Sequence, residues 1–169
     1  MASRKRRVAQ GCLGIVVVLA AIVLIFGRRF VFKRHWDVVS IATTPESSIC
    51  ALASFDGPIT LIAGGYDKGS PFEELGMAIA RKARRVILLG TTAPKIEEAV
   101  RRAAHEISRM PQILHARNLE HASELAAKDA VSGEAVLLSP ACASYDMFRN
   151  FQERGELFRI LARRIAAQA

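Results

Sequence analysis

Short, continuously apolar runs alternate with helix-forming stretches along most of this 169-residue chain. The apolar runs are VVSI (38–41), ITLIA (59–63), VILLG (86–90), a weaker run at 112–115 and AVLLS (135–139). The stretches that favour helices are 45–54, 71–84, 94–107, 119–130 and 146–166. Continuous apolar strands separated by helices are typical of a parallel sheet that is covered on both faces. The pattern therefore predicts an α/β, Rossmann-like fold with a mostly parallel sheet and helices on both faces.

The first 36 residues differ from the rest of the chain in charge. They hold eight Lys/Arg and no Asp/Glu, whereas residues 37–169 hold 16 of each, so the net charge of +8 belongs to the N-terminal segment alone. A basic nucleic-acid-binding face on the main domain is therefore not expected. We predict two parts, a basic-flanked segment over 1–36 and a domain over 37–169.

The N-terminal segment contains twenty uncharged residues, Val8 to Gly27. A helix of this length rises roughly 30 Å, the thickness of the hydrocarbon core of a bilayer. We interpret residues 8–27 as one transmembrane helix that contacts the membrane. A cleaved signal peptide is the main alternative, which the lack of a small-x-small cleavage site before RRFVFKR disfavours. A rearranged start to the gene is a third alternative.

Three loops that follow predicted strands carry glycines, hydroxyls and a cation. They are SIATTPES (40–47), GGYDKGS (64–70) and SPACASYDMFRNF (139–151). The carboxyl ends of parallel strands meet at one edge of a sheet, where ligands bind. Lys68 supplies a positive charge there, and Ser144 supplies a hydroxyl beside an expected helix start. Such groups suit an anionic ligand, a carboxylate or a phosphate.

Purely structural interpretations compete with these functional ones. GGYDKGS lacks the GxxxxGK[ST] pattern of a phosphate-binding loop, and Ser144 would serve equally well as a helix cap. Cys142 lies in an apolar stretch, which favours a buried thiol over a nucleophile. The three cysteines and four histidines show no metal-ligand spacing, so no metal site is expected. The run ARKARR (80–85) indicates a solvated helix end.

The three loops together resemble the C-terminal domain of the Mur ligase family, in its branch that uses D-glutamate. The matching stretches are SIATTPESS (40–48), PITLIAGGYDKGSPFEEL (58–75) and VLLSPACASYDMFRNFQERGELF (136–158). The resemblance implies an ATP-dependent amide ligase of peptidoglycan synthesis that adds D-glutamate to UDP-N-acetylmuramoyl-L-alanine. In that family ATP phosphorylates the nucleotide-sugar carboxylate, and the amine of D-glutamate attacks the acyl phosphate. The C-terminal domain closes over a central ATPase domain and holds the amino acid.

The resemblance also implies roles for individual residues. Lys68 matches a lysine that pairs with a D-glutamate carboxylate, and Thr43 and Ser144 match hydroxyl ligands of the same amino acid. Phe151 matches the residue that closes this pocket. Backbone support for the pocket is assigned to Gly64, Gly65 and Asn150. No catalytic residue and no metal ligand is assigned.

The sequence departs from the family pattern in two ways. Val38-Val39-Ser40 stands where the family reads Asn-Asp-Ser, whose aspartate binds the ATP ribose. The 169 residues also contain no GKT-type phosphate loop and no magnesium ligands of a central domain. ATP and Mg²⁺ are thus implied for the family, and neither is expected to bind this chain alone.

These features lead to one main functional expectation and two alternatives. We expect the C-terminal part of a D-glutamate-adding ligase, inactive alone, with D-glutamate and the missing ligase domains or cell-wall synthesis proteins as partners. The domain is expected to lie in the cytoplasm, tethered to the cytoplasmic membrane. The alternatives are a membrane-anchored binding module without catalysis and a truncated gene product.

Overall fold

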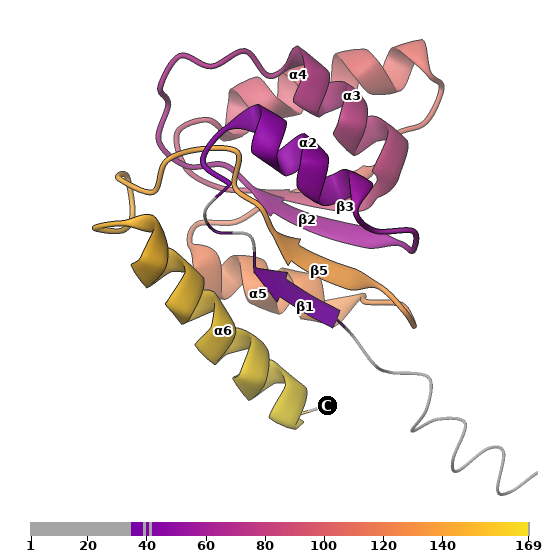
Figure 1. Ribbon diagram of the computed structural model, residues 1–169. Coiled ribbons are helices and arrows are strands. Elements are labelled where there is room, and N and C mark those ends of the chain that lie inside the picture. Colours follow the sequence, from indigo (N-terminus) through magenta and orange to yellow (C-terminus); the bar gives the residue numbers. More distant parts are fainter. Residues whose placement is uncertain (1–34, 39, 41, 169) are drawn as a thin grey trace, which may run out of the picture. The chain divides into compact units, whose positions relative to one another are not determined.

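The described part of the chain is a single parallel sheet with helices on both of its faces (Figure 1). In a computed structural model of the protein, the residues described are 35–38, 40 and 42–168. Their strands are β1 (His35–Val38), β2 (Ile59–Ala63), β3 (Ala83–Leu88), β4 (Gln112–His115) and β5 (Ala135–Leu138). Their helices are α2 (Pro45–Ala53), α3 (Glu73–Lys82), α4 (Ala93–Glu106), α5 (Leu119–Lys128) and α6 (Phe151–Gln168). The strand order is β1-β5-β2-β3-β4, and every neighbouring pair is parallel, which confirms the predicted α/β sheet.

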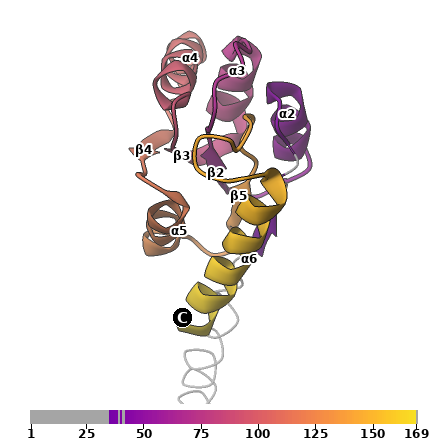
Figure 2. The ribbon, with the colours of Figure 1, turned by 90° about the vertical axis from the view of Figure 1, so that its left-hand side faces the viewer.

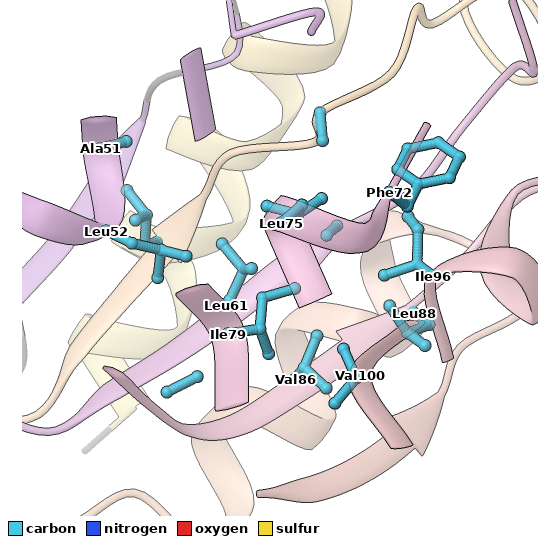
Figure 3. Packing of buried hydrophobic residues seen from close by; sticks show 14 of the residues in the cluster. Ala51, Leu52, Leu61, Phe72, Leu75, Ile79, Val86, Leu88, Ile96 and Val100 are labelled. Atoms are coloured by element: carbon cyan, nitrogen blue, oxygen red, sulfur yellow. The ribbon is translucent and has the colours of Figure 1, made fainter. Parts of the chain in front are cut away.

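The helices divide into two layers (Figure 2). Helices α2, α3 and α4 pack on one face, where Leu61 of β2 and Val86 of β3 meet Leu75 and Ile79 of α3 (Figure 3). Helices α5 and α6 cover the other face, where Phe158 of α6 is fully buried. Because successive residues of a strand point to opposite faces and both faces are covered, β2 and residues 86–88 of β3 are apolar apart from Thr60.

Several element boundaries differ from those expected. Strand β1 covers 35–38 instead of 38–41, since its backbone pairs in register with β5, His35 opposite Ala135 and Val38 opposite Leu138. Helix α6 begins at Phe151 instead of residue 146, because a turn precedes it. The strands at 59–63 and 112–115 have the predicted bounds.

The structure does not support the expected N-terminal transmembrane helix. No helix within the described residues is long and apolar enough to cross a membrane. The longest of them, α6, has 18 residues and carries charges throughout its length, among them Glu153, Arg159 and Arg164. Residues 8–27, on which the expectation fell, lie outside the described part of the chain.

A buried charge network crosses the amino-terminal ends of the strands. Arg85 of β3 is fully buried and donates hydrogen bonds to the Thr60 hydroxyl (2.8 Å) and the Ala126 carbonyl (2.7 Å). Glu134, also fully buried, accepts from Arg84 (2.7 Å) and from Thr60. The interpretation of 80–85 as a solvated helix end is therefore wrong at Arg85, because α3 ends at Lys82 and β3 begins at the next residue.

At the opposite edge, two neighbouring strands send their connections to different faces. The connection from β2 leads to α3, while that from β5, its neighbour in the sheet, leads to α6 on the other face. In parallel α/β sheets the crevice for a ligand opens where neighbouring connections diverge in this way. The predicted functional loops follow β1, β2 and β5, so they meet at this point.

Candidate functional site

Backbone hydrogen bonds join the three predicted loops into one layer above the sheet edge. The loop after β5 lies in the middle. Its Ala141 amide donates to the Ala42 carbonyl of the β1 loop (3.0 Å), and its Ala143 carbonyl accepts from the Tyr66 amide of the β2 loop (3.0 Å). The structure thus brings together the segments that carry Thr43, Lys68 and Ser144.

Gly64 and Gly65 allow this close approach of the loops. Their φ angles are +114° and +151°, and a Cβ would lie 2.0 Å from the Leu89 carbonyl oxygen at Gly64 and 2.4 Å from the Ala143 carbonyl oxygen at Gly65. Both positions therefore exclude a side chain. The glycines predicted as backbone support act in the structure by letting neighbouring loops pack on one another.

A fourth loop, after β3, joins the same layer and was not expected from the sequence. The Thr92 hydroxyl accepts from the Gly65 amide at 3.0 Å and lies 3.2 Å from Cys142 Sγ. Burial raises the pKa of the Cys142 thiol to about 11. The expectation of a packed thiol is confirmed, because a thiol with this pKa is protonated at neutral pH and is a poor nucleophile.

Arg154 of α6 is a second residue that sequence reasoning missed. Its guanidinium is buried and donates to the Ser40 carbonyl (2.8 Å), the Ser40 hydroxyl (3.1 Å) and the Cys142 carbonyl (3.2 Å). Burial lowers the pKa of Arg154 to about 10, so it remains charged at neutral pH. It ties α6 to the loops after β1 and β5, and its spacing in the sequence carried no signal of this role.

Lys68 lies exposed on the β2 loop, where its ammonium is accessible to a ligand. Its Nζ is 5.6 Å from the centroid of the Tyr145 ring. Among the residues that the structure describes, Lys68 forms no ion pair and its ammonium donates no hydrogen bond. Tyr145, next to Ser144 in the chain, is two-thirds exposed at 66%. The β2 and β5 loops therefore present a cation beside the segment that carries a predicted hydroxyl ligand.

Ser144 is placed differently from the sequence expectation. It does not lie at the start of α6 but opens a turn, in which its carbonyl accepts from the Phe148 amide at 2.8 Å. Ser144 is buried, with 3% of the residue exposed. Two residues later, both carboxylate oxygens of Asp146 are buried and have no hydrogen-bond partner within the described part of the chain. This turn thus holds polar groups that the folded domain itself does not use fully.

The remaining predicted residues lie around the same layer. Thr43 is half-buried next to Thr44, whose hydroxyl caps α2. Asn150 caps α6 through its side-chain oxygen, which accepts from the Glu153 amide at 2.8 Å. The Phe151 carbonyl accepts from the Ser40 hydroxyl at 2.8 Å. All four predicted ligand residues, Thr43, Lys68, Ser144 and Phe151, therefore belong to loops and a helix start at one edge of the sheet.

The chemistry of this layer suits an anion better than a metal ion. It offers a cation and hydroxyls, and the described residues include no group of three His, Cys, Asp or Glu side chains that could hold a metal. A groove of about 700 Å³ lies elsewhere, between α5 and α6. None of the four predicted ligand residues lines that groove, so its size is not evidence for this site.

Comparisons with known proteins give a family and several relatives. The model of the family described as Mur ligase, glutamate ligase domain, matches residues 28–142. UDP-N-acetylmuramoylalanine--D-glutamate ligase from Symbiobacterium thermophilum is 48% identical over 126 residues, covering 75% of this chain and 27% of the relative. The protein of the same name from Clostridium perfringens is 40% identical over 143 residues, covering 82% of this chain and 31% of the relative. The chain thus spans less than a third of the length of these relatives.

A solved structure was also matched. The structure of the UDP-N-acetylmuramate-alanine ligase from Thermotoga maritima aligns with this chain at 9% sequence identity and a TM-score of 0.47. The alignment covers 75% of this chain and 25% of the Thermotoga maritima chain.

Proposed function

The chain belongs to the Mur ligase family, and we propose that it is the amino-acid-binding, C-terminal part of a ligase that adds D-glutamate to UDP-N-acetylmuramoyl-L-alanine. The observation that carries the proposal is the available Lys68 ammonium, held beside the Ser144 turn by joined loops. The identity of the amino acid, D-glutamate, is taken from the names of the relatives. The place of action in this proposal is the cytoplasm, as the family resemblance implies.

In this proposal the chain binds and orients the amino acid. The Lys68 ammonium donates charge-assisted hydrogen bonds to one carboxylate of D-glutamate, while the hydroxyls of Ser144 and Thr43 donate to the carboxylates. Phe151 closes the pocket on its apolar side. With both carboxylates held, the amine is left free to face a reaction partner, which is what orientation contributes to an amide-forming step.

ATP and Mg²⁺, which the family uses, do not fit the sequence of this chain or the residues that the structure describes. Val39 stands where the family's ribose-binding aspartate is expected, the sequence has no GxxxxGK[ST] loop, and the described residues hold no metal-binding cluster. When bound in the family, these groups supply the activated acyl phosphate. We assign no part of that step to this chain.

The first test is binding of D-glutamate to the 169-residue protein, followed by NMR. A charge-assisted contact contributes roughly 1.5–3 kcal/mol, and without further domains around the ligand we expect about millimolar affinity, near −4 kcal/mol. Chemical-shift changes should be confined to the loops around Thr43, Lys68 and Ser144. Lys68→Ala and Ser144→Ala should abolish them, whereas Lys82→Ala, which removes an exposed lysine from α3, should not. Changes elsewhere, or equal binding in all variants, would contradict the proposed site.

The second test concerns catalysis. We expect the 169-residue polypeptide by itself neither to hydrolyse ATP nor to form an amide bond, because phosphoryl transfer needs a phosphate cradle and a bound metal. Phosphate release and product formation would be measured against a mock preparation. Turnover above that background would show that the assignment of amino-acid binding alone is incomplete.

A binding module without catalysis is the second candidate, favoured by Val38-Val39 in place of the family's Asn-Asp. The two candidates are distinguished by adding the remaining part of the Symbiobacterium thermophilum relative as a separate polypeptide. Restored ligation identifies a ligase part, while D-glutamate binding without ligation identifies a module.

A further inference from the structure

The acidic neighbour of Lys68 is held by another residue. Asp67 precedes Lys68 directly in the β2 loop, yet its Oδ2 accepts from Lys95 Nζ of α4 at 2.5 Å. Its Oδ1 accepts from the Gly69 amide at 2.8 Å. Both oxygens of Asp67 therefore have partners other than Lys68. The hydrogen bond from Lys95, followed by that from Gly69, lowers the pKa of Asp67, so it is charged at neutral pH.

The Lys68 ammonium rests instead on an aromatic pair. It lies over the Tyr145 ring at 5.6 Å, and the Tyr66 ring meets Tyr145 nearly edge-on, with centroids 6.3 Å apart. The face of an aromatic ring attracts a cation without accepting its N–H donors as a carboxylate would. This contact thus places Lys68 while leaving its donors for a ligand.

We propose that Lys95 is a positioning residue of the amino-acid site, which holds Asp67 so that the Lys68 ammonium stays on Tyr145 and available to a ligand carboxylate. This role rests on the proposed function for the identity of the ligand. The placement of Lys68 itself is independent of that function.

Loss of Lys95 would weaken binding of a ligand carboxylate in two ways. The freed Asp67 carboxylate is one residue from Lys68, so it can pair with the ammonium and draw it from Tyr145. It also leaves an uncompensated negative charge where the ligand carboxylate approaches. Both effects pass through the charge of Asp67, so replacing Asp67 with asparagine should cancel them. Both should weaken at high salt, because these groups are exposed enough to be screened.

The first experiment needs no ligand. Protons of the Lys68 ε-methylene near the face of Tyr145 should show an upfield ring-current shift in the NMR spectrum of the 169-residue protein. Lys95→Ala should abolish this shift, and Lys95→Ala with Asp67→Asn should restore it. Arg101→Ala, which removes the same charge from α4 but pairs with Glu97, is the matched control and should leave it unchanged. An unchanged shift in Lys95→Ala would overturn the proposal.

The second experiment measures D-glutamate binding to the same variants. Lys95→Ala should weaken binding about fivefold, the upper range for exposed charge pairs, and the double variant should regain wild-type affinity. A double variant that stays weak would show that Lys95 touches the ligand directly, which overturns the positioning role. If the wild type binds no D-glutamate while the ring-current shifts follow the expected pattern, the proposed function fails and the placement of Lys68 by Lys95 stands.

Discussion

The two ends of the sheet use charged side chains in opposite ways. At the amino-terminal end, Arg85 and Glu134 are fully buried, and hydrogen bonds join Glu134 to Arg84 and Arg85 to backbone carbonyls. At the carboxyl-terminal end, Lys68 rests on an aromatic ring with no carboxylate partner among the described residues, and the oxygens of Asp146 have no hydrogen-bond partner there. The amino-terminal end pairs its buried charges internally, while the carboxyl-terminal end also holds two charged groups, Lys68 and Asp146, that have no hydrogen-bond partner among the described residues.

The difference follows from what each end has to do. A buried charge that lacks a partner destabilises the folded state, so an edge that serves stability pairs its charges completely. An edge that binds a ligand has to leave some polar groups without internal partners, and it depends on rigid neighbours to keep them in place. Here the rigid neighbours are the loops packed at Gly64 and Gly65 and the buried Arg154.

The largest expected effect is the loss of Glu134. Glu134 Oε1 lies 3.6 Å from Nε of Arg85, and both side chains are fully buried. Glu134→Ala therefore leaves Arg85 buried without an acidic partner, and breaking a buried pair in this way costs roughly 3–5 kcal/mol in the free energy of unfolding. The measurement is urea unfolding followed by far-UV circular dichroism. The control is Glu98→Gln, which breaks an exposed pair with Arg102 and should have no measurable effect. An equally small effect at Glu134 would remove the distinction between the two ends.

The same carboxylate should make stability depend on pH. Burial acts to raise the pKa of Glu134, but hydrogen bonds from Arg84, Thr60 and the Val131 amide outweigh it, so the pKa is lowered in the folded state. The stabilisation is therefore fully present above the unfolded value of about 4.3 and is lost as pH falls through the lower folded value. Glu134→Gln should flatten the decline in stability below about pH 4. An unchanged decline would show that other groups dominate acid unfolding.

A smaller effect is expected from the glycines that bring the loops together. In Gly64→Ala the new Cβ would meet the Leu89 carbonyl at 2.0 Å with φ at +114°, so we expect a loss of roughly 3 kcal/mol. Gly69→Ala is the matched control, because its φ is +78° but nothing lies within 4 Å of the new Cβ. Gly69→Ala should lower the free energy of unfolding by only roughly 1–2 kcal/mol, which is the cost of a left-handed backbone for a residue with a Cβ. If thermal unfolding shows the same loss of stability in Gly64→Ala and Gly69→Ala, the backbone around Leu89 moves easily to make room for the new Cβ.

The sequence predicted the sheet and the loops that carry Lys68 and Ser144, because apolar runs and local motifs are visible over a few residues. For Arg85 the sequence predicts a solvated helix end, because ARKARR has helix-forming residues and no turn signal between α3 and β3. Its burial depends on Thr60 and on α5, which are distant in the chain.

The site residues that the sequence did not predict also depend on contacts between distant parts of the chain. Arg154 and Ser40 are 114 positions apart, and Thr92 and Cys142 are 50 apart. Neither pair has a local pattern that reveals it. The Lys95–Asp67 pair likewise joins α4 to the β2 loop across 28 positions. Contacts of this kind are set by the order of strands in the sheet, which periodicity alone does not supply.

The smallest expected effect has the opposite sign and compares the two buried carboxylates directly. Asp146→Asn replaces a carboxylate whose oxygens are both buried without a partner among the described residues. A neutral amide of the same shape is less costly to bury, so we expect the free energy of unfolding to rise by about 1 kcal/mol. The substitution also removes an attraction that partly offsets the burial lowering the pKa of Arg154 to about 10, so that pKa should fall further. This loss acts in the opposite direction and keeps the net gain small, while Arg154 stays charged at neutral pH. Urea unfolding at neutral pH should therefore show Asp146→Asn stabilised and Glu134→Gln destabilised. If both variants lose stability to the same extent, the Asp146 carboxylate stabilises the fold as Glu134 does, and the carboxyl-terminal edge does not hold an unpartnered carboxylate as we infer.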